Sequence, residues 1–186
     1  MSQLVIIPTY NEKENIEAIV RAVTDLEEGF HVLVIDDGSP DGTADIVRWL
    51  QEKCGFEGRL FLVERTGKLG LGTAYIAGFR WAIEHGYDYV FEMDADFSHA
   101  PKDLPRLLHA CREEGNDVAI GSRYVSGVNV VNWPMGRVLM SYFASQYVKL
   151  ITGLKIHDTT AGFVCYRRKV LETMELDKIR FKGYAF

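Results

Sequence analysis

The sequence predicts an α/β protein built on a mainly parallel sheet with helices on both faces, and two observations carry this prediction. Short runs of consecutive apolar residues alternate with longer segments in which apolar residues recur at helical spacing. A strand that is apolar at every position is typically buried on both faces, as in a parallel sheet. Polar, turn-forming motifs follow three of these runs. Repeated strand–helix units place such motifs, and any ligand, at the carboxyl edge of the sheet.

Three strand-and-helix pairs are expected in the first 85 residues. Each strand is a run of apolar residues, and Pro8 stops the first. Each helix has apolar residues three or four positions apart, which places them on one face. The second helix follows a turn-rich loop, with Thr43 or Asp41 as its candidate cap. The expected strands are residues 4–7, 32–35 and 60–64, and the expected helices are residues 11–26, 43–53 and 73–85.

The chain continues with two strands around one helix, and then with a longer apolar segment. Strands are expected at residues 87–93 and 118–121, and a helix is expected at 104–114. Residues 132–153 are rich in apolar and aromatic side chains, with Arg137 and Lys149 among them. This pattern fits an interfacial helix with aromatic and basic anchors. It fits a core or dimer helix equally well, so both interpretations stand.

The composition excludes several classes of protein. With 186 residues, of which 47% are hydrophobic, the chain is long enough for one domain with a sizeable core. Lys and Arg number 21 and Asp and Glu number 26, a net charge of −5, so no nucleic-acid partner is expected. The three cysteines are widely spaced and fit a reducing compartment rather than a zinc or disulfide framework. No signal peptide and no run of about 18 apolar residues is present, which favours a cytoplasmic protein.

Asp94 and Asp96 form the sharpest chemical motif, at the end of the expected strand 87–93. Side chains two residues apart in extended backbone point the same way. Two converging carboxylates repel each other unless a cation neutralises them, and Mg²⁺ or Mn²⁺ is typically held by carboxylates together with substrate phosphates. We therefore expect a divalent metal site, with Ser98 or His99 as a further candidate ligand. The competing interpretation is a solvated acidic turn.

Two other strand ends carry groups suited to a nucleoside. Asp37 can accept hydrogen bonds from a ribose hydroxyl or a base N–H, although a plain turn would also explain it. Tyr10 offers a flat face to a base, and Glu12 can accept from the amino or imino groups of that base. The alternative there is a helix start with Asn11 as its cap.

Three cationic side chains lie in the expected loops of the same edge. Arg65 and Lys68 belong to a glycine-rich loop, where they either meet phosphate or are simply solvated. Arg123 follows the expected strand 118–121. A guanidinium at that position either clamps a diphosphate with two hydrogen bonds or pairs with a nearby carboxylate.

In this order, the motifs resemble those of the polyprenyl-phosphate glycosyltransferases, and within them the dolichyl-phosphate mannose synthases. The resemblance covers essentially the whole chain. The paired aspartates are common to many glycosyltransferases, whereas the loop at 39–43 combined with 70–74 and 96–99 is more specific. The matching residues are 8–12, 34–43, 70–74, 93–99, 121–124, 158–163 and 182–186.

The resemblance implies a GT-A fold in one domain, with a nucleotide-binding half at about residues 1–96 and an acceptor-side half at about 97–186. It implies an inverting enzyme that moves mannose from GDP-mannose to a polyprenyl phosphate at the cytoplasmic face of a membrane. Residues 132–153 would contact that membrane peripherally, and a membrane subunit or a homo-oligomer is a candidate partner. Relatives continue past Tyr184, so the chain is expected to be truncated at its C-terminus. UDP-glucose or another donor, or a non-catalytic nucleotide-sugar-binding subunit, remain the alternatives.

The resemblance also assigns roles to individual residues. Asp94, Asp96 and Arg123 would be the catalytic residues, with Mg²⁺ or Mn²⁺ as cofactor. Asp96 would be the principal metal ligand, helped by Asp94 and by Ser98, which stands where some relatives have glutamine. Arg123 would contact the donor phosphates. The donor site would comprise Pro8, Tyr10, Glu12, Ile35, Asp37, Asp94, Ala95, Asp96 and Arg123.

Overall fold

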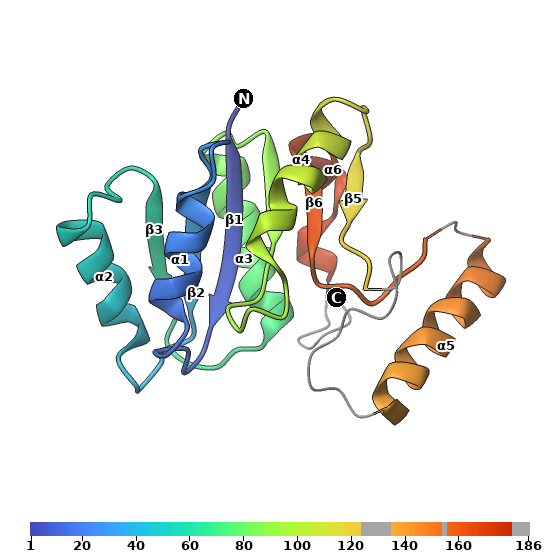
Figure 1. The fold of residues 1–186 in the computed structure, drawn as a ribbon, viewed down its shortest axis with the longest axis horizontal. Helices are drawn as coiled ribbons and strands as arrows, with labels where there is room; N and C mark the ends of the chain where they lie inside the picture. The colour runs from blue at the N-terminus through green and yellow to red at the C-terminus, as the bar shows by residue number, and fades with distance from the viewer. Residues whose placement is uncertain (124–134, 154–155, 180–186) are drawn as a thin grey trace.

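A six-stranded sheet forms the centre of the molecule in the computed structural model, which describes residues 1–123, 135–153 and 156–179 (Figure 1). The strand order is β3-β2-β1-β4-β6-β5. The first four neighbours in this order are parallel, and β6 runs antiparallel to both β4 and β5. The prediction of a mainly parallel sheet is confirmed. The strands are β1 (Gln3–Thr9), β2 (His31–Asp36), β3 (Leu60–Glu64), β4 (Tyr89–Glu92), β5 (Val118–Ile120) and β6 (Val164–Arg167).

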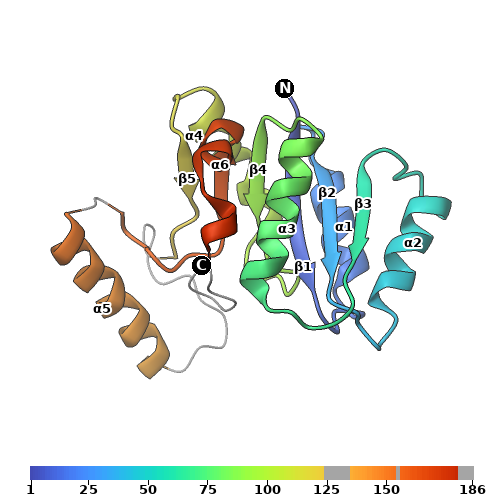
Figure 2. The same ribbon diagram turned by 180° about the vertical axis from the view of Figure 1, so that it is seen from behind.

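Helices cover both faces of this sheet. In Figure 1, α1, α2 and α4 lie in front of it, and Figure 2 shows α3 and α6 on the opposite face. Two short 3₁₀ turns, η1 (Pro101–Asp103) and η2 (Leu176–Lys178), complete the described elements. The helices are α1 (Ile16–Thr24), α2 (Thr43–Lys53), α3 (Leu71–Glu84), α4 (Leu104–Arg112), α5 (Met135–Thr152) and α6 (Arg168–Thr173).

The sheet separates two apolar cores, which explains why its central strands are apolar at every position. Val5 and Ile7 of β1 pack with α1 and α4 on one face, whereas Leu4 and Ile6 pack with α3 on the other. All four side chains are fully buried. Alternate residues of a strand point to opposite faces, so two covered faces require a continuous apolar run.

Helix α3 lies unusually close to β1. A Cβ atom at Gly78 would come within 2.7 Å of the Ile6 side chain, so only glycine permits this approach. The close packing fixes the height of α3 against the sheet. It thereby determines which α3 side chains reach the loops at the carboxyl edge.

Two sequence expectations about element ends were wrong. Strand β1 continues through Pro8, because β4 pairs with β1 only as far as Ile6 and the missing N–H falls beyond that ladder. Helix α1 begins at Ile16 rather than at residue 11, so Asn11 is not its cap. Asn11 instead has a left-handed φ of 61° in the loop before it.

Helix α5 stands apart from the sheet in both views (Figures 1 and 2). Its described contacts are polar, since Ser145 and Ser141 meet the hydroxyl groups of Thr159 and Thr160. Five of its large apolar side chains are exposed, which favours an interfacial or dimer helix over a core helix. Residues 132–134 of the expected helix lie outside the described part. The α5 apolar surface consists of Met140, Phe143, Tyr147, Leu150 and Ile151, each at least 63% exposed.

Candidate functional site

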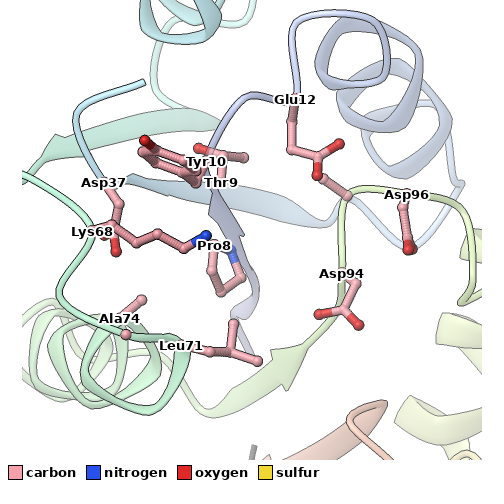
Figure 3. A pocket seen from close by; sticks show the side chains of 12 residues that line it. Pro8, Thr9, Tyr10, Glu12, Asp37, Lys68, Leu71, Ala74, Asp94 and Asp96 are labelled. Atoms are coloured by element: carbon pink, nitrogen blue, oxygen red, sulfur yellow. The ribbon is translucent and has the colours of Figure 1, made fainter. Parts of the chain in front are cut away.

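A pocket of about 240 Å³ opens at the carboxyl edge of the sheet (Figure 3). Its walls come from the ends of β1, β2 and β4 and from the first turn of α3. This is the edge at which ligands bind in open α/β sheets. The lining residues are Pro8, Thr9, Tyr10, Glu12, Asp37, Lys68, Gly70, Leu71, Ala74, Asp94, Ala95 and Asp96.

The wall formed by residues 10–13 is held in place by the loop at 39–43. Three consecutive backbone N–H groups of the first loop each donate to a side-chain oxygen of the second. Short polar side chains commonly bind backbone groups in this way. The loops therefore form one unit, which keeps Asn11 in its left-handed conformation. The pairs are Asn11 with Ser39, Glu12 with Thr43 and Lys13 with Asp41, all at 3.0 Å.

Asp37 is fixed by Arg65, which the sequence had placed with the candidate phosphate ligands. The Arg65 Nε donates to Asp37 Oδ1 at 2.6 Å, and both side chains are nearly buried. Arg65 also donates to Thr73 at the start of α3, at 2.8 Å. Arg65 is therefore not simply solvated, because a carboxylate 28 residues away binds it, whereas its contact with phosphate stays a prediction.

Lys68 lies across the end of the pocket that holds Tyr10 and Asp37. Its Nζ is 4.5 Å from the centroid of the Tyr10 ring, a cation–π distance. Figure 3 shows Lys68, Tyr10 and Asp37 at one end of the pocket and Asp94 and Asp96 at the other. Flat and charged groups suited to a base are thus separated from the paired carboxylates.

Asp94 and Asp96 both line the pocket, as the sequence predicted. The Tyr75 hydroxyl donates to Asp94 Oδ1 at 3.3 Å, and the Ser98 backbone N–H donates to Asp96 Oδ1 at 2.9 Å. Burial raises the pKa of Asp94, and the Asp96 charge acts in the same direction against the lowering effect of His99. A divalent cation would relieve this repulsion, so the donor set fits Mg²⁺ or Mn²⁺.

These two carboxylates would supply only part of a coordination shell. Among the described residues, no group of three or more His, Cys, Asp or Glu side chains is arranged to hold a metal ion. Mg²⁺ is usually bound by one or two carboxylates with waters and substrate phosphates, which suits a site of this kind.

His99 is a support for Asp94 in this structure. Its Nδ1 accepts the Asp94 backbone N–H at 3.1 Å, which occupies the lone pair of that nitrogen. The ring stacks on Phe163, with centroids 5.1 Å apart, and burial lowers its pKa. The other candidate ligand, Ser98, is exposed and is not part of the pocket lining.

Arg123 pairs with a carboxylate, which was one of the two interpretations of its position. Its Nε and Nη2 donate to Asp158 at 2.7 and 2.8 Å, and the Asp158 side chain is fully buried. Burial opposes ionisation of Asp158, but the hydrogen bonds from Arg123 outweigh it and hold the pKa below its ordinary value. Arg123 does not line the pocket, and neither does Ile35, which is buried in the core on the α3 face of β2. Tyr124 and residues 182–186, also quoted for the resemblance, lie outside the described residues.

Comparison with known proteins decides the family. The model of glycosyl transferase family 2 matches residues 4–174. The chain belongs to this family. This family 2 glycosyltransferase is 50% identical over 183 residues to the polyprenol monophosphomannose synthase of Mycolicibacterium smegmatis, covering 98% of this chain and 68% of that protein. It is 47% identical to the undecaprenyl-phosphate mannosyltransferase of Micrococcus luteus, covering 100% of this chain and 74% of that protein.

Solved structures show the same fold. Glucosyl-3-phosphoglycerate synthase of Mycobacterium tuberculosis aligns with a TM-score of 0.64 at 22% identity, over 91% of this chain and 57% of that one. The mannosyltransferase PcManGT of Pyrobaculum calidifontis aligns with a TM-score of 0.60 at 22% identity, over 91% and 45%. The family 2 glycosyltransferase described here therefore has the expected GT-A fold. None of its described helices is both long enough and apolar enough to cross a bilayer.

Proposed function

We propose that this glycosyltransferase moves mannose from GDP-mannose to a polyprenyl phosphate. The observation that carries this proposal is the identity of 50% and 47% to two proteins named for mannose transfer to polyprenyl phosphates. Its pocket offers a nucleoside end and a carboxylate end at the correct edge of the sheet. A UDP-sugar donor is the alternative, because a structural neighbour was solved with uridine diphosphate and Mn²⁺.

The pocket suggests how the donor would lie. Tyr10 would stack on the base, while Asp37 and Glu12 accept hydrogen bonds from the nucleoside. Pro8 would border the same end, with Ile35 supporting β2 from the core. The diphosphate would then reach Asp94, Ala95 and Asp96 at the other end. This arrangement makes residues 1–96 the nucleotide-binding half and leaves the later residues for the acceptor.

A divalent ion would be held by Asp96, with Asp94 beside it and Ser98 as a weaker candidate. When bound, Mg²⁺ or Mn²⁺ neutralises negative charge that develops on the leaving diphosphate. Arg123 would add positive charge toward the donor phosphates, held in one orientation by Asp158. The acceptor phosphate is anionic at neutral pH, so these residues position the reactants and exclude water rather than remove a proton.

The α5 apolar surface would bring the enzyme to its acceptor. A polyprenyl chain resides in a membrane, so the enzyme must work at that surface. Amphipathic helices with exposed aromatic and aliphatic residues bury such a face in the lipid interface. We therefore propose peripheral contact of α5 with the cytoplasmic face of a membrane. A second copy of this chain, or a membrane subunit, is the competing occupant of the same surface.

Calorimetry with four ligands tests the donor assignment. GDP, GDP-mannose, UDP and UDP-glucose are titrated with and without Mn²⁺ into the parent chain, Asp96→Ala and Asp25→Ala. Asp25 is an exposed aspartate just after α1, outside the pocket, and serves as the matched control. The proposal expects Mn²⁺-dependent binding of the guanosine ligands that Asp96→Ala loses and Asp25→Ala keeps.

Other outcomes separate the alternatives. A preference for the uridine ligands would move the donor to the UDP-sugar class. Failure of a folded parent chain to bind any of the four would contradict the site assignment. Mass spectrometry of a polyprenyl phosphate incubated with GDP-mannose and enzyme would then detect or exclude the mannosylated product.

A further inference from the structure

From helix α3, the side-chain hydroxyl of Tyr75 reaches one of the paired carboxylates, that of Asp94. The Tyr75 side chain is 2% exposed and lies in the core between α3 and the sheet, with Phe79 and Val90 in the same cluster. Its hydroxyl donates to Asp94 Oδ1 at 3.3 Å. Burying a hydroxyl in such a core is unfavourable unless it is hydrogen-bonded, and packing alone would be served by phenylalanine. The hydroxyl therefore has a role at Asp94.

The helix that carries Tyr75 is held rigidly. Gly78 places α3 against Ile6 of β1 at a distance that no larger residue permits. Arg65 binds Thr73 in the first turn, two residues before Tyr75. Close packing at Gly78 and the hydrogen bond at Thr73 thus fix the position of the Tyr75 hydroxyl.

Asp94 is also supported on its other side. The Asp94 backbone N–H donates to His99 Nδ1, and Asp94 Oδ2 lies 4.0 Å from the same nitrogen. Supported at its backbone and at Oδ1, the carboxylate has its rotation restricted. Groups that orient metal ligands from outside the coordination shell commonly change metal affinity by about 10- to 100-fold.

We propose that Tyr75 is a positioning residue, whose hydroxyl fixes the rotation of the Asp94 carboxylate so that Asp94 and Asp96 are ordered for a divalent ion and the donor diphosphate. This inference rests on the proposed function, since it assumes that the pair binds metal with donor. A tyrosine in the core between α3 and the sheet would thereby help to preorganise the site.

Tyr75→Phe removes the hydroxyl and keeps the ring. Tyr166→Phe is the matched control, because its hydroxyl donates at 3.4 Å to Glu92, a neighbouring carboxylate outside the pocket. Mn²⁺ binding is followed by electron paramagnetic resonance with and without GDP, and thermal unfolding is recorded for each variant. We expect Tyr75→Phe to weaken Mn²⁺ binding about tenfold. Tyr166→Phe should leave Mn²⁺ binding unchanged.

A double-variant cycle with Asp94→Asn makes the test independent of general destabilisation. If Tyr75 acts through Asp94, Tyr75→Phe should cause no further loss of Mn²⁺ affinity in the Asp94→Asn background. An unchanged Mn²⁺ affinity in Tyr75→Phe, or an equal loss in Tyr166→Phe, would overturn the inference while leaving the proposed function intact. No Mn²⁺-dependent binding by the parent chain would overturn the proposed function itself, and the inference with it.

Discussion

The guanidinium of Arg123 and the carboxylate of Asp158 meet through two hydrogen bonds, of 2.7 and 2.8 Å, across 35 residues of sequence. Asp158 is fully buried, and Arg123 is 18% exposed in its side chain. The pair joins the segment after β5 to the segment before β6. It holds the Arg123 guanidinium in place through a partner, Asp158, that is not among the residues lining the pocket.

Asp158→Asn should lower the free energy of unfolding by roughly 2–4 kcal/mol, because it removes the carboxylate charge that binds a largely buried guanidinium through two hydrogen bonds. The depressed pKa of Asp158 means that the pair stabilises the fold above the ordinary aspartate pKa and that this stability is lost as the pH falls through the folded value. Urea denaturation at pH values from about 3 to about 7, on both sides of the ordinary aspartate pKa of about 4, measures both effects. Glu113→Gln, which breaks the exposed pair with Arg112, is the control and should change little.

Arg65→Lys should weaken nucleotide binding about tenfold, because an ammonium cannot reproduce the fork that joins Asp37 to Thr73. The loss should appear in the GDP affinity measured with Mn²⁺ present throughout, since the change lies beside Asp37 and not at the paired carboxylates. Calorimetry with GDP measures it. Arg48→Lys, at an exposed pair with Asp45, controls for the substitution itself. Equal GDP affinity in Arg65→Lys and the parent chain would contradict the role given to Arg65.

Glu92→Gln should stabilise the metal-free protein at high pH. Burial raises the pKa of Glu92 to about 8, against an ordinary value of 4.5, with Tyr166 opposing the shift. The contribution of the neutral Glu92 carboxyl to the stability of the fold is therefore fully present below pH 4.5. This stability is lost as the pH rises through about 8. Because glutamine never ionises, the variant should gain roughly 1–4 kcal/mol at pH 8.5 relative to the parent chain and about nothing near pH 4. Urea denaturation in a chelator follows the difference, and a pH-independent gain would argue against this account.

Phe143→Asp combined with Leu150→Asp should reduce binding to phospholipid vesicles at least about tenfold, since it places charge on the α5 apolar surface. Thermal unfolding should change little, because both side chains are exposed. Gln146→Asp, which adds charge at an exposed polar position of the same helix, should bind vesicles more nearly as the parent chain does. Cosedimentation measures the bound fraction. Vesicle binding unaffected by the double variant, with loss of a dimer in sedimentation analysis, would assign the surface to a second copy.

The sequence predicted five of the six strands, including the edge strands β3 and β5, and missed β6, for a physical reason. Strands β1 and β2 are buried on both faces, so their apolar runs are a local signal. Strand β6 was not predicted, because its place depends on pairing with β4, as in the Phe91–Cys165 pair of residues far apart in the chain. The apolar pattern of α5 predicted its helix, but it could not decide between an exposed interfacial face and a face buried in the core or in a dimer.

Within the site, the sequence identified residues whose chemistry is explicit and missed those that support them. Asp37, Asp94 and Asp96 follow strand ends and could be placed from spacing. The pairing of Arg65 with Asp37 was not predicted, because the sequence gives a side chain's charge but not its direction. Tyr75 was not singled out from the sequence, and it is the 3.3 Å contact of its hydroxyl with Asp94 that connects it with the site.

The backbone N–H groups of residues 11–13 donate three hydrogen bonds to side chains of the loop at 39–43, and these bonds limit how the donor site can be altered. The backbone of the wall that presents Tyr10 and Glu12 is held by a segment that is not among the residues lining the pocket. Replacing Tyr10 or Glu12 alone would change the side chain but leave the backbone conformation of this wall unchanged. To change the base preference, both segments would therefore have to be exchanged together.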